Sequence, residues 1–188
     1  MSMVRGTAPR ELSLLECALL ALLRQSPSSG YDLRRLFAET PFVHFSDSPG
    51  AVYPALRRLE RRKLVSSGGP GGGRRRRAMR LTPRGAAALE RWLRTPVTRD
   101  ELTRPLDGPM LRFAFMEEVL GRPACLTFLR DYGARLHDYV VELRAYGAAH
   151  TKEMSLSGRL AFSSGLADFK ARERWAEHAR RAITEARR

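Results

Sequence analysis

The stretch from residue 48 to residue 80 constrains the fold of this chain more than any other. It predicts a short helix, a strand, a glycine-rich turn followed by arginines, and a second strand. Ser48 is suited to cap a helix that begins at Pro49, because the first helical residue needs no backbone N–H. At about 100° per residue, one apolar stripe of that helix is formed by Val52, Leu56 and Leu59.

The other side of this predicted helix is basic. It carries Gly50, Pro54, Arg57, Arg58 and Arg61, with Tyr53 beside them. A helix with an apolar back and an arginine front suits the DNA major groove, which presents acceptor groups on its floor and phosphates along its rims. The alternative is a solvated basic face, since charged outer faces are the norm on surface helices.

A second basic feature follows the helix directly. The run from Gly68 to Gly73 contains five glycines and Pro70, a composition typical of a hairpin end. Four arginines come next, Arg74, Arg75, Arg76 and Arg77, and then the returning strand 78–81. Alone, such a run is typical of a soluble loop. Beside a basic helix it predicts a wing whose guanidinium groups contact phosphates or a minor groove.

The charge distribution agrees with a nucleic-acid partner for the first half of the chain. The formal net charge is +14, of which residues 1–106 hold +11 and residues 107–188 only +3. Only three of the basic residues are lysines, and arginine favours bidentate contact with phosphate or guanine.

The order of five segments resembles the PadR family of bacterial winged-helix transcriptional regulators over about residues 12–93. These are a first helix, an SGYDL helix, the SPGAVYPALRRLE helix, the Gly/Arg hairpin and the LTPRG helix. The resemblance implies that Ser48, Gly50 and Tyr53 open the recognition helix, that Tyr53 touches the DNA backbone, and that the wing arginines grip flanking phosphates. The chain departs from the family pattern at Lys63, where glycine is usual, and at residues 78–80, where aromatic residues are common.

Local signals place the other elements of this half. Ser13 and Glu16 have the spacing of a capping box before a helix to about residue 24, and Ser29 with Asp32 has a similar spacing before a helix over 30–39. Thr82 and Pro83 open a further helix. The expected fold is mainly α with a small β-hairpin: a flexible tail (1–11), a winged helix-turn-helix domain (12–94), a linker (95–106) and a helical dimerisation domain (107–188).

The second half is predicted to be helical, with a heptad pattern on its longest helix. This heptad seam consists of Leu126, Leu129, Gly133, Leu136, Val140, Leu143 and Gly147. Two such helices packed across a two-fold axis would pair the winged heads, in line with the dimeric use of this domain in the resembled family. The alternative is that the helices pack within one chain as an ordinary bundle.

Aromatic residues on the same helix allow a ligand site. Tyr132, Tyr139 and Tyr146 recur every seven residues, and Phe113 and Trp175 are further candidates for lining a cavity. Some regulators of the resembled family sense phenolic acids or drugs. The alternative is packing, with the tyrosine hydroxyls at the rim.

Other function classes find no support in the sequence. Cys17 and Cys125 stand among apolar neighbours and are interpreted as reduced packing residues rather than a redox pair. No apolar run is long enough to span a membrane, the first ten residues lack the core of a signal peptide, and a cytoplasmic location is expected. The histidines are isolated, and no nucleophile–base arrangement can be argued, so neither a metal, nor a cofactor, nor an enzyme is expected.

These patterns favour a sequence-specific DNA-binding regulator. We expect a homodimeric repressor on a palindromic operator, open to release by a small aromatic ligand. A protein–protein adaptor that uses a winged helix to dock acidic partners is the alternative. RNA binding is less favoured, because no exposed aromatic platform is visible.

Overall fold

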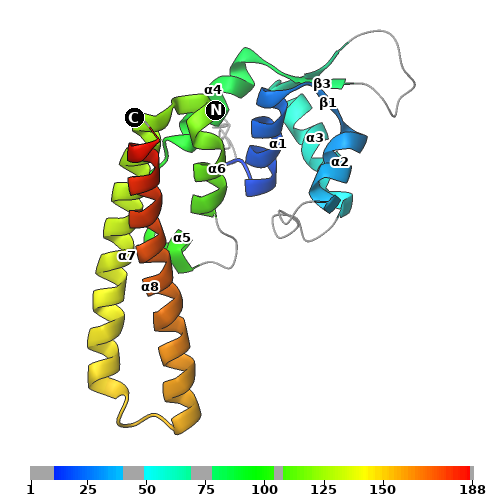
Figure 1. Ribbon diagram of the computed structural model, residues 1–188. Coiled ribbons are helices and arrows are strands. Elements are labelled where there is room, and N and C mark those ends of the chain that lie inside the picture. The colour runs from blue at the N-terminus through cyan, green and yellow to red at the C-terminus, as the bar shows by residue number, and fades with distance from the viewer. Residues whose placement is uncertain (1–10, 40–48, 69–77, 104–107, 187–188) are drawn as a thin grey trace, which may run out of the picture. The chain divides into compact units, whose positions relative to one another are not determined.

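The computed structural model describes residues 11–39, 49–68, 78–103 and 108–186. The chain forms two compact units, Met1–Arg94 and Thr95–Arg188, and each is described here by itself (Figure 1). The expected fold class is confirmed: a mainly helical chain carries a small antiparallel sheet in a winged helix, followed by a helical region.

The first unit is built around helix α1, Leu14–Gln25. Seven consecutive residues of this helix, from Leu15 to Ala21, are buried, so that it is surrounded by other elements on nearly all sides. Helices α3, Val52–Arg61, and α4, Pro83–Leu93, and the strand β3 pack against it. The predicted capping box is confirmed, because Ser13 and Glu16 exchange their two hydrogen bonds.

Helix α2, Gly30–Glu39, has the predicted bounds. In its first turn, the N–H of Asp32 donates a hydrogen bond to the hydroxyl of Ser29. Leu33 and Phe37 of this helix are buried in the core, whereas Tyr31 and Leu36 are 50% and 40% exposed. The outer side of α2 is therefore open to solvent at these two residues.

The sheet has three strands rather than the two of a simple hairpin. β2, Val65–Ser67, and β3, Ala78–Leu81, pair antiparallel, with Ser66 opposite Arg80. β1, Ser28–Ser29, pairs with the other edge of β3 and makes the order β1-β3-β2. A strand of two residues is too short to show in the sequence the alternation that predicts a β-strand.

Helix α4 is joined closely to the end of the hairpin. Thr82 caps it as expected, with Pro83 in the first turn. The Thr82 hydroxyl also donates towards the carbonyl oxygens of Lys63 and Leu64. A Cβ on Gly85 would lie 2.0 Å from the Leu64 carbonyl oxygen, so this close approach requires glycine.

The described residues of the second unit form four helices: α5 (Arg99–Thr103), α6 (Gly108–Leu120), α7 (Arg122–His150) and α8 (Leu156–Glu185). Helices α7 and α8 lie antiparallel, side by side (Figure 1). The segment expected to be a linker contributes to this unit, because Val97 and the α5 residue Leu102 are buried in its core. The sequence does not predict this packing, because a helix of five residues is too short to show a clear hydrophobic periodicity.

Part of the heptad seam is buried within the same chain. Leu129, Leu136 and Val140 are at most 1% exposed, and the first two share a core cluster with Ala176 of α8. A Cβ on Gly147 would lie 2.7 Å from the Phe162 ring, so this glycine makes room for α8. These buried positions pack within the chain, whereas Leu126, Gly133 and Leu143 are partly exposed, and dimerisation through the seam stays a prediction.

The two cysteines are buried, one in each unit. Burial raises the pKa of the Cys125 thiol above its usual value, which disfavours the reactive thiolate. Among the described residues, no helix combines the length and apolar character that crossing a membrane requires.

Candidate nucleic-acid interface

Helix α3 separates an apolar face from a basic one, as the sequence predicts. Its buried residues are Val52, Ala55, Leu56 and Leu59. Its exposed residues include Tyr53, Pro54, Arg57 and Arg61. A 3₁₀ turn, Pro49–Ala51, precedes the helix, so regular α-helix begins three residues later than expected. Ser48 lies outside the described residues, and Gly50 is exposed in the turn.

Arg58 differs from the other arginines of α3 because a buried carboxylate holds it. Its Nε donates to Oε1 of Glu16 on α1 at 2.6 Å, and its side chain is 33% exposed. The side chain of Glu16 is only 5% exposed. This ion pair fastens the recognition helix to the central helix of the unit. The sequence predicts only the capping-box role of Glu16, since a contact 42 residues distant leaves no local signal.

The ring of Tyr53 rests over the start of α2. A Cβ added at Gly30 would lie 2.9 Å from Cε1 of Tyr53 and 3.3 Å from Cδ1 of Leu56. Glycine at this position therefore lets the exposed ring of Tyr53, at 40% exposure, lie close to the backbone of the SGYDL helix. Two of the five segments that carry the family resemblance thus meet in space.

Helix α3 ends in a Schellman motif at Lys63. The N–H of Lys63 donates to the carbonyl of Glu60, and the N–H of Leu64 donates to the carbonyl of Leu59. Lys63 has a φ of 57°, the left-handed conformation that favours glycine. The unusual residue noted in the sequence therefore leaves the helix end in place and adds backbone strain there.

The wing begins beside α3. The hydroxyl of Ser67 in β2 donates to a carboxylate oxygen of Glu60, which ties the strand to the helix. Arg80 of β3 is exposed, and its side chain lies over Gly68. The sequence predicts Arg80 only as part of the returning strand, and its positive charge is the signal there for a contact with DNA. Arg74, Arg75, Arg76 and Arg77 lie outside the described residues.

The five aromatic candidates for a ligand site occupy three different places in the second unit. Phe113 packs face to face on Phe128 and edge-on to Trp175, and Phe128 in turn stacks on buried Tyr132. Tyr139 instead packs against Phe169. Tyr146 stacks on His150 near Phe162. The seven-residue spacing separates the tyrosines by about 10 Å along the helix, so they do not line one cavity.

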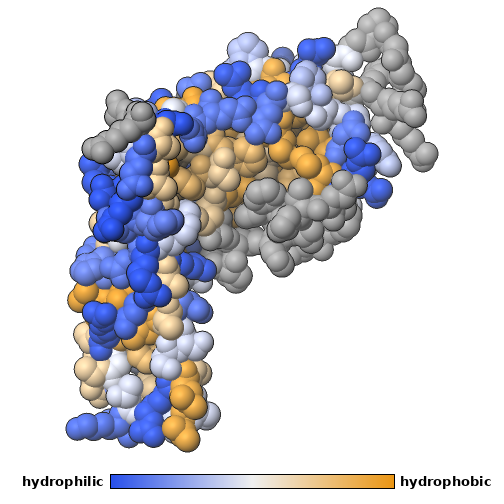
Figure 2. All heavy atoms as spheres, viewed as in Figure 1, coloured by the Kyte–Doolittle hydropathy of each residue, from blue (hydrophilic) through white to orange (hydrophobic). Residues whose placement is uncertain are grey.

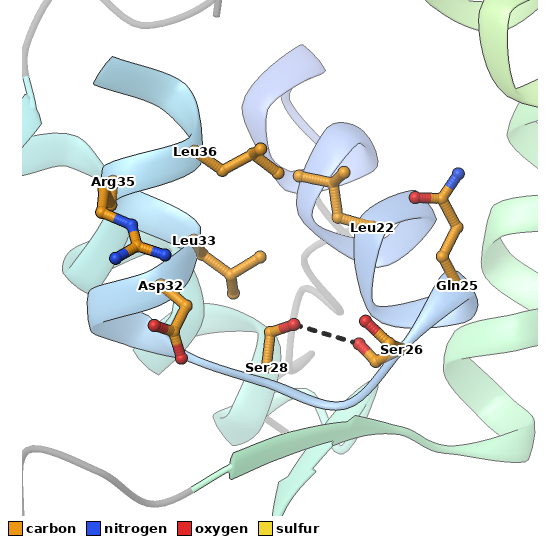
Figure 3. Close-up of a pocket in the computed structure, with 8 residues that line it drawn as sticks. All are labelled: Leu22, Gln25, Ser26, Ser28, Asp32, Leu33, Arg35 and Leu36. Atoms are coloured by element: carbon orange, nitrogen blue, oxygen red, sulfur yellow. Dashed lines mark hydrogen bonds between the residues drawn. The ribbon is translucent and has the colours of Figure 1, made fainter. Parts of the chain in front are cut away.

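A small pocket is found elsewhere, between α1 and α2 of the first unit (Figure 3). Its volume is about 200 Å³, and none of the five aromatic candidates lines it. Leu22 and Leu33 form its apolar side, and the hydroxyl of Ser28 donates across its rim to the carbonyl of Ser26. Ligand sites for drug-sized molecules usually measure about 300–1,000 Å³. This pocket is a shallow depression beside the turn.

Three helices, a hairpin behind the third of them and an exposed arginine face on that helix define the winged-helix class of DNA-binding domain. Residues 19–91 match the model of the transcriptional regulator PadR-like family. Over these residues, the first unit is similar to the transcriptional regulators that this family comprises.

Solved structures of regulators are similar over most of the chain. The PadR-like regulator BC1756 from Bacillus cereus is 22% identical, with 93% of this chain and 99% of that chain covered and a TM-score of 0.40. PadR of Bacillus subtilis in complex with operator DNA is 23% identical, with coverage of 94% and 99% and a TM-score of 0.41. The same B. subtilis protein in complex with p-coumaric acid is 24% identical, with coverage of 91% and 99% and a TM-score of 0.41. No curated protein matches the chain.

Proposed function

We propose that this regulator is a homodimeric repressor that recognises a palindromic operator through α3 and its wing. The observation that carries the proposal is the division of α3, which buries its apolar face in the unit and leaves Tyr53, Arg57 and Arg61 exposed on the other. These three follow one another at i, i+4 and i+8, on one ridge along the helix. A ridge of this kind can enter the major groove, with arginine fitted to guanine or phosphate acceptors.

The neighbouring residues extend this surface. Pro54 is exposed beside the ridge, and Ser48 and Gly50, at the start of the recognition segment, approach the DNA backbone in this proposal. Arg80 and the wing arginines at positions 74–77 contact flanking phosphates or the minor groove. The whole contact set is rich in arginine, so binding releases many counterions and depends steeply on salt.

A dimer places two such heads on the two halves of an operator. Half-sites in helix-turn-helix complexes lie about 34 Å apart, which a single head cannot span. The buried residues of the heptad seam cannot supply the interface. Exposed apolar residues on the long helices can, above all Leu156 and Leu160, which are 66% and 61% exposed. Figure 2 shows hydrophobic surface at this end of the α7–α8 pair.

The aromatic cluster of the second unit is the proposed place of effector action. Phe113, Trp175 and Tyr132 belong to one packed group with Phe128. An aromatic acid that inserts into this group would shift α6 against α7 and alter the spacing of the heads. p-Coumaric acid, which is bound in the B. subtilis structure, is the first compound to test.

Selection of bound sequences from random DNA tests the function directly, with and without p-coumaric acid. The expected result is one palindromic sequence, bound with nanomolar affinity and with a logarithmic salt slope of about −0.9 per phosphate contact.

Replacement of Arg74, Arg75, Arg76 and Arg77 by alanine should weaken binding to all sequences and flatten the slope. Arg57→Ala should instead change the preferred sequence. Absence of DNA binding at low salt, together with a co-purifying acidic protein, would favour the adaptor function.

A further inference from the structure

Glu16 has a contact that its role in α1 does not require. Its Oε2 accepts the N–H of Ser13 at 3.0 Å and completes the capping box. Either glutamate or glutamine serves at this position of a capping box, so the cap needs no negative charge. A residue that is 4% exposed loses hydration when it carries such a charge, and therefore requires a charged partner.

That partner is Arg58. The 2.6 Å distance between its Nε and Oε1 of Glu16 is that of a short, charge-assisted hydrogen bond. Only one of the five N–H groups of the guanidinium takes part in this bond. Since the guanidinium is planar, fixing its Nε also fixes the plane in which the terminal amino groups lie.

The position of Arg58 on α3 makes this orientation relevant to DNA. At about 100° per residue, Arg58 stands between buried Ala55 and the exposed ridge that ends at Arg61. One third of its side chain is exposed. A long arginine side chain normally loses rotamer freedom when it is immobilised on a partner. Here the protein has ordered the side chain before DNA arrives.

We infer that Glu16 is a positioning residue for DNA binding, which holds Arg58 with its terminal amino groups preset at the edge of the DNA-contacting ridge. The inference rests on the proposed function of α3. It reverses the sign of the simplest electrostatic expectation. Removing a carboxylate from a DNA-binding unit should tighten binding by reducing repulsion, whereas loss of the positioning contact weakens it.

The test uses two variants of the full chain, each of which replaces one glutamate by uncharged glutamine. Fluorescence anisotropy measures the affinity of each variant for the selected operator. Glu16→Gln keeps the capping box and should weaken binding about 5- to 10-fold. Glu90→Gln, on the exposed side of α4, removes the same charge and should bind as well as the wild type or more tightly. Equal or tighter binding by Glu16→Gln would overturn the inference.

A second comparison separates positioning from general stability. In an Arg58→Ala background, Glu16→Gln should cause no further loss, because the residue it positions is gone. An equal loss in both backgrounds would mean that Glu16 acts through the fold. If Glu16→Gln does not fold, Arg58→Lys leaves Glu16 and its cap intact and should lose the same 5- to 10-fold. Binding of Arg58→Lys at wild-type affinity would contradict the inference.

The wild type distinguishes this inference from the function on which it rests. If the wild type binds no DNA sequence, the proposed function is wrong. If it binds and Glu16→Gln behaves like Glu90→Gln, only the positioning role is wrong.

Discussion

Lys63 carries a left-handed backbone at the end of α3, where most helices of this kind use glycine. The Schellman hydrogen bonds from Lys63 and Leu64 are nevertheless both formed. For a residue with a Cβ, this conformation costs about 1–2 kcal/mol. The packing of Leu59 and Leu64, which are at most 4% exposed, outweighs that cost.

Lys63→Gly should therefore stabilise the protein. We expect the free energy of unfolding to rise by about 1 kcal/mol, less than the full strain because glycine also gains freedom in the unfolded chain. Urea denaturation followed by circular dichroism measures it. Lys63→Ala is the matched control, since it removes the charge but keeps the Cβ and should change stability by less than about 0.5 kcal/mol. An equal rise in the free energy of unfolding of both variants would show that the backbone of Lys63 is not strained.

Gly30 offers a second prediction at this scale. Because a Cβ there would lie 2.9 Å from the Tyr53 ring, Gly30→Ala should displace the ring from its place on the exposed face. We expect DNA affinity to fall about 3- to 10-fold in the wild-type background and to be unaffected in a Tyr53→Ala background. The measurement is a double-mutant cycle on the selected operator. A loss of the same size in both backgrounds would show that Gly30 matters only to the fold.

At the scale of the elements, the α7–α8 pair explains the glycines of the heptad seam. At Gly133, an added Cβ would make an ordinary contact of 3.7 Å with Ala176. At Gly147, it would lie 2.7 Å from the ring of Phe162. Two glycines at equivalent heptad positions of one helix thus have different roles.

The Gly133→Ala and Gly147→Ala variants should differ by about 1–3 kcal/mol in their free energy of unfolding. Gly133→Ala should raise the free energy of unfolding by about 0.5–1 kcal/mol, because alanine favours the helix. Gly147→Ala should not be stabilised in this way, because the added methyl group would clash with the Phe162 ring. Replacing Phe162 by leucine in the same chain should remove the clash and restore the stabilisation. Thermal unfolding measures all three variants. Equal stabilisation by both alanines would show that the Phe162 side chain moves aside without a measurable cost in free energy.

At the scale of the whole molecule, a dimer must use surface that one chain leaves exposed. We expect the wild type to be dimeric in light scattering, and Leu156→Asp with Leu160→Asp to be monomeric with unchanged helix content. DNA affinity should then fall more than about tenfold, because the second head no longer adds to the first. Ser157→Asp with Ala161→Asp adds the same charge at nearby exposed positions and is the control. A wild-type monomer, or a dimer that survives the leucine changes, would contradict the interface.

Local chemistry made much of the first unit predictable. Ser13, Thr82 and Pro83 mark helix starts through bonds that reach only three residues, so their spacing in the chain suffices to find them. The apolar stripe of α3 is equally local, and Val52, Leu56 and Leu59 are all buried. The same reasoning placed α2 with its observed bounds.

Contacts between distant segments escaped this reasoning. The pair of Glu16 and Arg58 joins two helices, and the pairing of Ser28 with Met79 adds a strand of only two residues. The heptad pattern shows that α7 needs a partner but contains no information on which helix supplies it.

The sequence by itself determined where α1, α2 and α4 begin, which side of α3 is apolar and where the positive charge gathers, because each of these depends on neighbours within a few residues. Only the tertiary structure decided that Arg58 is held by Glu16, that Tyr53 rests over Gly30 and that the buried leucines of α7 pack with α8. Those outcomes depend on which surfaces meet when helices pack, and many pairings satisfy the same hydrophobic pattern until the whole core is assembled.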